Sequence, residues 1–515
     1  MSAPTSGGGL RADSVLGSPT MRMPAPDQAL IARKAEIVRA LQRIVPGEGV
    51  IGDASGLIPF QSDGLSAYRQ TPLAVVLPET TAQVCAVLAW CQANGVKVVP
   101  RGAGTSLSGG ALPLQDGVVL GMAKFNRVLE VDYENRCALV QPGVTNLAIT
   151  NAVQADGFYY APDPSSQIAC TIGGNVAENS GGVHCLKYGL TTNNVLGCEL
   201  VLMSGEVVRL GGKGFDAAGY DLMGVVTGSE GLLGVVTEVT VRLLPTPETA
   251  RALLLGFPTV EAAGATVGDI IAAGVIPAGL EMMDNPAIVA AEAFVGAGYP
   301  TEAAALLIVE LDGPEAECSE LAGHVRAIAN ARGATSIQVS QSEAERLAFW
   351  AGRKAAFPAV GRIAPDYYCM DGTIPRRQLP HVLTRITEMA ESYGLGVANV
   401  FHAGDGNLHP LILYDADQPG QLEKAEAFGA DILKLCVAVG GVLTGEHGVG
   451  VEKRDLMGEM FNETDLACQQ RVKCAFDPDL LLNPGKVFPR LHRCAELGRV
   501  HVHRGQVAFP ELPRF

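Results

Sequence analysis

The sequence predicts a protein of mixed helices and strands, of the α/β or α+β class, with two or three domains. The chain has 515 residues, more than one hydrophobic core usually organises. Hydrophobic residues make up 48% of the chain and glycine is abundant, with 61 residues, which is typical of a globular enzyme with many tight turns. Segments of helical periodicity alternate with short apolar runs typical of strands.

Charge and cysteine content narrow the class of protein further. The formal net charge of -16 argues against nucleic acid as the main partner. The 12 cysteines include no C-x-x-C pair, which is typical of reduced thiols in a cytosolic protein and argues against an iron–sulfur cluster. No apolar run reaches the ~20 residues of a membrane span, so we expect no transmembrane helix.

Residues 26–247 are expected to form the first domain, after a flexible tail at 1–25 that is rich in Gly, Ser and Pro. The first helix is expected from Pro26 to Ile44. A second helix begins after Thr80, its expected N-cap, and ends at Gly95. Strands are expected at 96–99, 118–120, 128–131, 138–140, 195–203 and 234–244, and a short helix at 147–156. Residues 161–192 are expected to form a loop that binds a ligand.

A second domain is expected at 248–470, because the pattern restarts after a linker at 245–247. It alternates in βαβ fashion: strands at 252–256, 305–311, 336–339 and 396–400, and helices at 259–273 and 316–332. Residues 471–490 are expected to form a separate C-terminal segment and 491–515 an irregular tail. His501 and His503 in that tail are not expected to be ligands.

Two loops rich in small residues indicate a binding site for a phosphate-containing ligand. The first, Pro100–Gly110, directly follows a strand, and its small residues let backbone N–H groups approach an anion. It matches neither a P-loop nor a Rossmann fingerprint. The second spans 161–182, and two such loops can hold the two ends of one dinucleotide. Gly228–Gly231 and Gly234–Glu238 extend the set.

With these loops, residues 45 to 489 resemble the FAD-linked D-2-hydroxy-acid dehydrogenases, and most closely the catalytic subunit of the glycolate oxidases. The resemblance implies an α+β fold: a two-part FAD-binding domain of the vanillyl-alcohol-oxidase type, an α+β cap over the flavin ring, and C-terminal helices. Thr105 stands where covalently flavinylated relatives carry His, which implies non-covalent FAD. The implied cofactor-binding residues are Gly102, Ala103, Gly104, Thr105, Ser106, Asp163, Ser166, Thr171, Gly174, Asn179, Gly181, Glu230, Val236 and Asn483.

Two short motifs gather histidines and a carboxylate. His402 and His409 flank a Gly-Asp-Gly-Asn sequence, and Glu446 precedes His447 between glycines. Two imidazoles and a carboxylate are a usual set for a divalent metal with open positions; a histidine hydrogen-bonded within a turn is the plainer alternative. The resemblance implies that His402, His409 and Glu446 bind a divalent metal such as Zn²⁺ or Mn²⁺. It implies that His447 is the general base.

The expected chemistry assigns further roles. A metal lowers the pKa of an alcohol, and a neutral histidine accepts its proton as hydride leaves Cα for flavin N5. Arg353 is the expected donor to the substrate carboxylate, with a surface salt bridge as its alternative role and Arg362 as second choice. Cys369 stands where the 2-hydroxyglutarate branch carries Lys, which argues against a dicarboxylic substrate.

The resemblance therefore predicts oxidation of glycolate to glyoxylate or of D-lactate to pyruvate, with electrons passed to a separate acceptor. The expected partners are a flavin-type subunit and an iron–sulfur subunit, in the cytoplasm at the inner face of the membrane. The alternatives are a stand-alone D-lactate dehydrogenase with a cytochrome or quinone acceptor, or a D-2-hydroxyglutarate dehydrogenase. A non-redox FAD transferase and an inactive FAD-binding subunit are more distant ones.

Overall fold

The first sheet gathers four strands from the N-terminal part of the chain. In this computed structural model, residues 23–214, 219–489, 502–503 and 506–507 are described. The strand order is β1 (Val50–Ile51), β2 (Ala74–Val76), β4 (Gly117–Gly121), β3 (Lys97–Arg101). β4 pairs parallel with both neighbours, as strands joined through a helix do. That helix is α4 (Thr81–Ala93), and the predicted cap is confirmed, because the Thr80 side chain accepts a hydrogen bond from the Gln83 N–H.

The predicted helix from Pro26 to Ile44 is wrong in its continuity. Two helices, α1 (Gln28–Ala32) and α2 (Lys34–Ile44), are separated at Arg33, which caps both. Asp27 begins the first one by accepting a hydrogen bond from the Ala29 N–H. Most of the predicted tails, 1–25 and 491–515, lies outside the described residues.

The second sheet is antiparallel, in the order β5 (Val128–Asp132), β6 (Cys137–Val140), β10 (Val235–Arg242), β8 (Val195–Val201), β9 (Val207–Gly211). The expectation of a plain loop at 161–192 is wrong, because that stretch contains three short helices. They are α6 (Ile172–Glu178), α7 (Cys185–Tyr188) and α8 (Thr191–Asn194). Buried Ile172 and Val176 hold α6 on the second sheet, so the polar residues around them are kept in place.

The third sheet has seven strands, in the order β15 (Ser336–Val339), β12 (Thr249–Phe257), β14 (Ala305–Gly313), β13 (Gly279–Asp284), β18 (Gly396–Phe401), β20 (Pro410–Tyr414), β16 (Asp366–Cys369). All its neighbours are antiparallel, so the expected βαβ alternation does not produce parallel pairs. Alternate residues of a strand point to opposite faces, and both faces are covered. One face packs on α10 (Val260–Ala272), α12 (Glu315–Ala331), α14 (Leu379–Tyr393) and α15 (Gln421–Ala438). The other packs on α11 (Asn285–Val295) and α13 (Glu343–Ala359).

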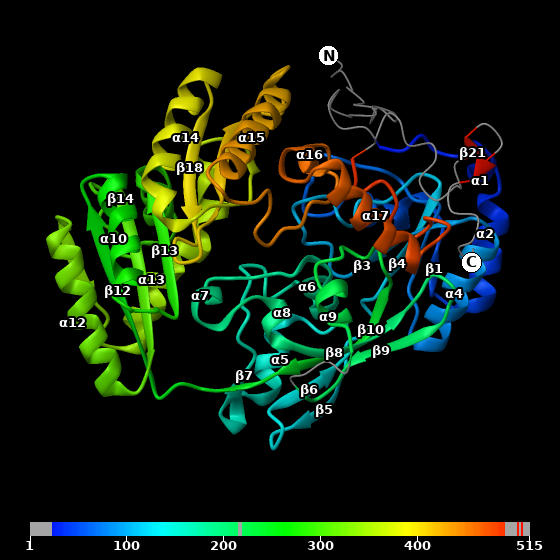
Figure 1. Cartoon of the computed structure of the whole chain (residues 1–515), viewed down its shortest axis with the longest axis horizontal. Coiled ribbons are helices and arrows are strands. Elements are labelled where there is room, and N and C mark those ends of the chain that lie inside the picture. The colour runs from blue at the N-terminus through cyan, green and yellow to red at the C-terminus, as the bar shows by residue number, and fades with distance from the viewer. Residues whose placement is uncertain (1–22, 215–218, 490–501, 504–505, 508–515) are drawn as a thin grey trace, which may run out of the picture.

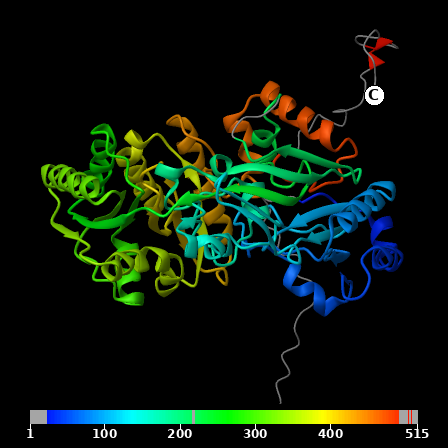
Figure 2. The same cartoon turned by 90° about the horizontal axis from the view of Figure 1, so that it is seen from below.

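Figure 1 shows these sheets as two lobes, with β1 to β10 in one lobe and β12 to β20 in the other. Figure 2 shows the lobes side by side along the long axis. The C-terminal helices α16 (Met457–Met460) and α17 (Glu463–Phe476) return to the first lobe, where Leu482 forms a parallel bridge with Val98. The remaining short elements are α3 (Ala54–Leu57), α5 (Asn146–Val153), α9 (Leu222–Val226), β7 (Phe158–Tyr159), β11 (Leu244–Pro245), β17 (Gly372–Thr373), β19 (Asn407–Leu408), β21 (Val502–His503) and β22 (Gln506–Val507).

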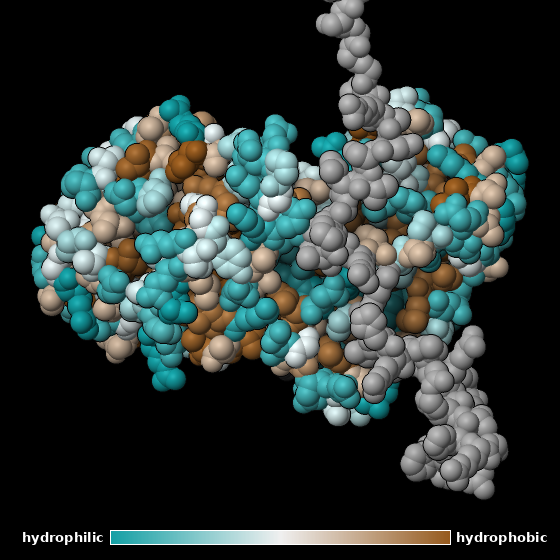
Figure 3. All heavy atoms as spheres, turned by 90° about the horizontal axis from the view of Figure 1, so that it is seen from above, coloured by the Kyte–Doolittle hydropathy of each residue, from teal (hydrophilic) through white to brown (hydrophobic). Residues whose placement is uncertain are grey.

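The predicted mixed α+β class is confirmed, and the predicted linker at 245–247 begins at the last residue of β11 and continues towards β12. The domain boundaries at 247, 470 and 490 stay a prediction. Among the described residues, no helix combines the length and the apolar character that crossing a bilayer requires. The face drawn in Figure 3 carries small hydrophobic patches between hydrophilic residues.

Candidate active site

A cavity of about 430 Å³ extends from the glycine-rich loops of the first lobe to the histidine motifs of the second. The predicted cofactor residues that line it are Gly102, Ala103, Gly104, Thr105, Ser106, Ser166, Thr171, Gly174, Glu230 and Val236. Glu446, His409 and His447 line it as well. Residues from both ends of the predicted site therefore face one continuous space.

The cavity wall at the glycine loops fits a dinucleotide. A Cβ on Gly102 would come within 2.4 Å of the Thr171 hydroxyl, so only glycine lets the two loops approach this closely. The Thr171 Oγ1 and Asn175 Nδ2 atoms are buried and have no hydrogen-bond partner among the described residues. Buried polar atoms are normally paired, so these two fit a polar ligand in the cavity.

Four predicted cofactor residues do not line the cavity and contact its walls instead. Asn483 donates hydrogen bonds to the carbonyls of Gly110 and Glu230, which ties the C-terminal segment to the first loop and to the Gly228–Gly231 segment. Asn179 ends α6 with φ +58°. Asp163 binds His184, and the Gly181 N–H donates to Glu446 Oε2 at 3.0 Å.

Charged residues lie beside these loops, and two of them, Glu178 and Lys486, were not assigned by the sequence interpretation. Glu230 accepts hydrogen bonds from the N–H groups of Val449 and Gly450, which fixes the segment after His447. Burial, with the repulsion of Glu230, raises the pKa of Glu178 well above its usual value. Burial likewise lowers the pKa of Lys486 to about 7.

His402, His409 and Glu446 come together as the sequence predicts. His402 follows β18 and His409 precedes β20, and their Nε2 atoms lie 3.2 and 3.1 Å from Glu446 Oε1. The three donor atoms all lie within 4.8 Å of one another, as a shared metal ion requires. Burial alone would raise the pKa of Glu446, but the hydrogen bonds and charges of both imidazoles hold it well below its usual value.

Glu281, on the unpredicted strand β13, supports this triad. Its Oε1 lies 2.7 Å from His402 Nδ1, and its Oε2 accepts a 2.7 Å hydrogen bond from Arg353 Nε. A carboxylate on the far ring nitrogen is the usual means of orienting a metal-binding histidine. Although burial raises its pKa, the charges of His402 and Arg353 lower it overall, so Glu281 stays ionised.

The structure places the two candidate arginines away from the cavity wall. Arg353 is 1% exposed and is held in the buried ion pair with Glu281, whereas the adjoining Lys354 lines the cavity. Arg362 is exposed, with its guanidinium over the ring of Phe294. A buried ion pair replaces the surface salt bridge that was the alternative for Arg353.

His447 lines the cavity beside the triad, and its ring stacks on that of His409 with centroids 4.8 Å apart. Burial lowers its pKa to about 4, so the imidazole is neutral near pH 7 and can accept a proton. Asp371 holds the backbone of this loop, because its carboxylate accepts hydrogen bonds from the N–H groups of Gly445, Glu446 and His447.

A charged contact joins the two lobes near the cavity. His184 Nδ1 lies 2.8 Å from Asp163 of the second glycine loop, and its Nε2 lies 3.1 Å from Glu310 of β14. Glu310 also pairs with Arg346 at 2.7 Å. Although burial lowers the pKa of His184, the two carboxylates raise it to about 10. The imidazolium therefore couples the loop to the third sheet.

Replacing His184 by Gln is expected to lower the free energy of unfolding by about 3 kcal/mol at pH 6.5 and below, because two buried carboxylates lose their partner. The charged His184 contributes its full stabilisation below the usual histidine pKa of 6.5, and this contribution is lost as the pH rises towards about 10. The difference in unfolding free energy between the wild type and His184→Gln should therefore shrink over that range. Urea unfolding of both proteins across this pH range measures it. The exposed His324→Gln is the control, and a deficit independent of pH contradicts the charged contact.

Gly182 permits the close packing of the second loop. Its φ is +145°, and a Cβ there would lie 2.5 Å from the backbone carbon of Asp163. Gly182→Ala is expected to yield protein with much less bound FAD, because the loop must move. The flavin-to-protein absorbance ratio after purification measures this effect. Gly268→Ala in α10, where a Cβ meets nothing within 4 Å, should keep full flavin content. Equal flavin content in both variants would contradict the claim that the loop conformation at Gly182 is needed for FAD binding.

Comparison with protein families supports the cofactor. Residues 72–211 match the FAD binding domain family, and residues 246–487 match the family of FAD linked oxidases, C-terminal domain. The structure is similar to p-cresol methylhydroxylase, with a TM-score of 0.76 at 18% identity, covering 91% of this chain and 99% of that one. The predicted vanillyl-alcohol-oxidase type of FAD fold is confirmed.

Curated relatives match nearly the whole chain. It is 58% identical to the glycolate oxidase subunit GlcD of Escherichia coli (strain K12), over 94% of this chain and 97% of the relative. It is 40% identical to the Bacillus subtilis (strain 168) GlcD, over 85% and 93%. It is 31% identical to a D-lactate dehydrogenase of Anaerostipes hadrus, over 88% and 98%. These matches confirm the predicted resemblance: the chain binds FAD and belongs to the FAD-linked oxidase family, in the branch that contains the GlcD subunits and D-lactate dehydrogenases.

Proposed function

We propose that the chain oxidises a small 2-hydroxy acid, glycolate or D-lactate, to the corresponding 2-oxo acid. The observation that carries this proposal is the neutral imidazole of His447 on the wall of the FAD cavity, directly beside the His402, His409 and Glu446 triad. Alcohol oxidation needs both a proton acceptor and a group that lowers the hydroxyl pKa. The relatives named glycolate oxidase subunit and D-lactate dehydrogenase support this substrate class.

The bound FAD supplies a hydride acceptor at its N5 atom. His447 accepts the hydroxyl proton; its ring stacks on that of His409, and the hydrogen bond from its backbone N–H to Asp371 holds its main chain in position. His402, His409 and Glu446 would hold a divalent cation such as Zn²⁺ or Mn²⁺, which would lower the pKa of the hydroxyl. The imidazole and carboxylate donors fit such an ion, and Glu281 orients His402 for it.

Arg353 remains the proposed anchor for the substrate carboxylate. Glu281 engages its Nε atom and fixes the plane of the guanidinium, which suits a two-point contact. Lys354 is the second candidate, because it lines the cavity one turn before Phe357, whose ring contacts that of His409. Cys369 presents a neutral thiol close to His409 and His447, so this end lacks the Lys that would pair with a second carboxylate.

We further propose that electrons pass to a separate acceptor. The GlcD relatives are named as subunits of a glycolate oxidase, which supports assembly with other subunits. We propose that these are a flavin-type subunit and an iron–sulfur subunit, in the cytoplasm at the inner face of the membrane. The D-lactate dehydrogenase relative favours the second candidate, a stand-alone enzyme with a cytochrome or quinone acceptor. Co-purification with an iron–sulfur protein distinguishes them.

An anaerobic visible spectrum tests the proposed reaction. Glycolate, D-lactate, L-lactate and D-2-hydroxyglutarate are added separately to the purified flavoprotein. Glycolate or D-lactate should bleach the oxidised-flavin band, and D-2-hydroxyglutarate should bleach it slowest. A band that none of these acids bleaches overturns the proposed function, and bleaching by D-2-hydroxyglutarate alone overturns the monocarboxylate assignment.

A further inference from the structure

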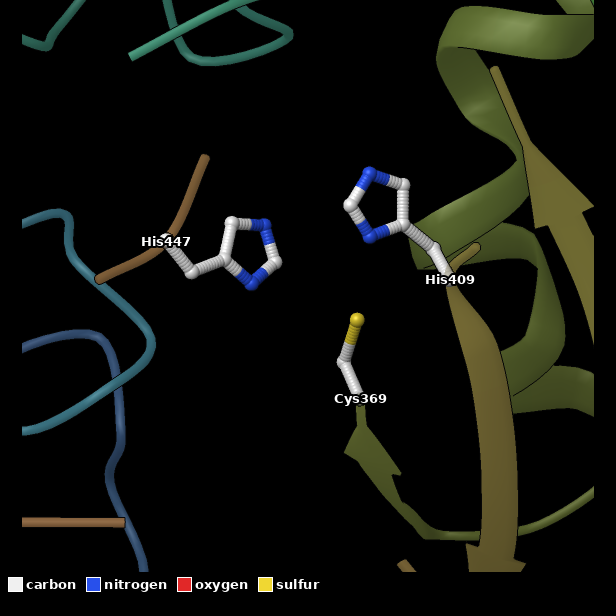
Figure 4. Close-up of side chains that lie close together, drawn as sticks. All are labelled: Cys369, His409 and His447. Carbon is white, nitrogen blue, oxygen red and sulfur yellow. The ribbon is translucent and has the colours of Figure 1, made fainter. Parts of the chain in front are cut away.

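Cys369, His409 and His447 converge on one point in the second lobe. Their thiol and ring nitrogen atoms all lie within 4.8 Å of one another. Figure 4 shows the three side chains pointing towards a common space from three separate segments. Cys369 ends β16, His409 lies between β19 and β20, and His447 lies in the loop after α15. Cys369 and His409 are buried, so the arrangement is held by the core rather than by surface side chains.

Two of the three residues in this group have a donor atom with little competing contact, whereas both ring nitrogens of His409 are engaged, by the carbonyl of Met370 at 3.3 Å and by Glu446 at 3.1 Å. Among the described residues, the Cys369 thiol has one hydrogen-bond partner, the carbonyl of the adjoining Met370 at 3.4 Å. The Nδ1 atom of His447 is buried and has no hydrogen-bond partner among the described residues. A buried ring nitrogen without a partner is costly, and a bound cation would satisfy it.

The group differs from the triad in its chemistry. The triad offers two imidazoles and a carboxylate, whereas this group offers two imidazoles and a sulfur atom. Thiolate is a soft ligand that selects Zn²⁺ and similar cations over Mn²⁺ or Mg²⁺. His409 belongs to both sets, and His447 belongs only to the second.

Two carboxylates, one of them also paired with Lys453 at 3.3 Å, lie beside this group and favour a dication. The Asp371 carboxylate is fully buried and lies 4.0 Å from His409 Nδ1. Glu446 lies 3.1 Å from the other nitrogen of the same ring. The apolar surroundings strengthen these attractions, because few water molecules can screen them.

We propose that Cys369, His409 and His447 form a second cation site, specific for thiophilic divalent ions such as Zn²⁺, whose occupation inhibits the enzyme. The thiol proton passes to solvent as the metal–sulfur bond forms, and when both sets hold an ion the ring proton of His409 passes to solvent as well, because each of its nitrogens then binds one ion. Inhibition rests on the proposed function, because an ion on His447 removes the proton acceptor. The site itself is independent of that function.

Zinc X-ray absorption of the holoenzyme tests the site. Cys468 is exposed and Cys494 lies outside the described residues, so both are replaced by Ser in every protein compared. Two equivalents of Zn²⁺ are added to each protein, one for the triad and one for the Cys369, His409 and His447 group. We expect a sulfur shell at about 2.3 Å in this background, lost in Cys369→Ser and in Cys369→Ala. Cys436→Ser, which removes another buried thiol, should keep the shell.

The same proteins are assayed for inhibition, each relative to its own rate without added zinc. The inhibiting Zn²⁺ concentration should rise by at least about tenfold in Cys369→Ser. Absence of the sulfur shell from the background protein, or its persistence in both Cys369 variants, overturns the site. A sulfur shell in an enzyme that zinc does not inhibit overturns the inhibitory role. If the sulfur shell is present but none of the tested 2-hydroxy acids reduces the flavin, the proposed function is refuted and the cation site stands.

Discussion

Replacing His447 by Gln is expected to slow flavin reduction by the 2-hydroxy acid on the order of 10²–10⁴-fold. Glutamine keeps a similar volume and can hydrogen-bond, but it cannot accept a proton near pH 7. The wild-type imidazole can, because burial lowers its pKa to about 4 and leaves it neutral. The loss should therefore appear in the rate of reduction at saturating substrate. Anaerobic stopped-flow absorbance of the flavin band measures that rate directly.

Two comparisons separate a chemical role from a structural one. The flavin content and thermal unfolding midpoint of His447→Gln should match the wild type, because the Asp371 contacts of this loop use backbone N–H groups. The exposed His381→Gln on α14 should reduce its flavin at the wild-type rate. A His447→Gln rate within about twofold of the wild type would be incompatible with His447 as the proton acceptor.

The parts of the site that the sequence predicts are those in which the chemistry is local. The glycines at 102 and 104 directly follow a strand, and only a short loop separates His402 from His409. Each motif can therefore be recognised from a short stretch of sequence. The triad forms when two sequence motifs, the one that contains His402 and His409 and the one that contains Glu446, lie close together. The antiparallel β18–β20 pair brings both histidines to one end of the sheet. Periodicity likewise placed α4 and its Thr80 cap.

The parts that the sequence did not predict depend on distant partners. Glu281 lies in β13, whose Gly-Leu-Glu-Met-Met-Asp sequence has no β-branched residue and alternates poorly, so neither the strand nor its carboxylate was recognised. Its partners, His402 and Arg353, come from β18 and α13. Asp371 is similar, because its hydrogen bonds reach a loop more than seventy residues away. Arg353 is buried because it pairs with Glu281, and nothing in the sequence of its own helix, α13, indicates this.

Replacing Glu446 by Gln is expected to abolish binding of the proposed divalent metal and to lower kcat/KM on the order of 10³-fold, or ~4 kcal/mol of transition-state stabilisation. Its Oε1 lies close to both His402 Nε2 and His409 Nε2, so it completes the triad. A neutral amide supplies a weaker ligand and no charge to offset the cation. Elemental analysis of the dialysed protein measures the metal, and steady-state kinetics measures the loss.

The matched variants show whether the metal or the fold is responsible. Glu281→Gln leaves the three metal-binding side chains in place and weakens only the contact that orients His402, so its metal affinity should fall by about 10–100-fold, less than for Glu446→Gln. It also leaves Arg353 without its buried partner, so its unfolding midpoint should drop. Glu459→Gln on the exposed side of α16 should change neither quantity. Wild-type protein that stays fully active after a chelator has removed every divalent ion would show that the triad acts through its imidazoles alone.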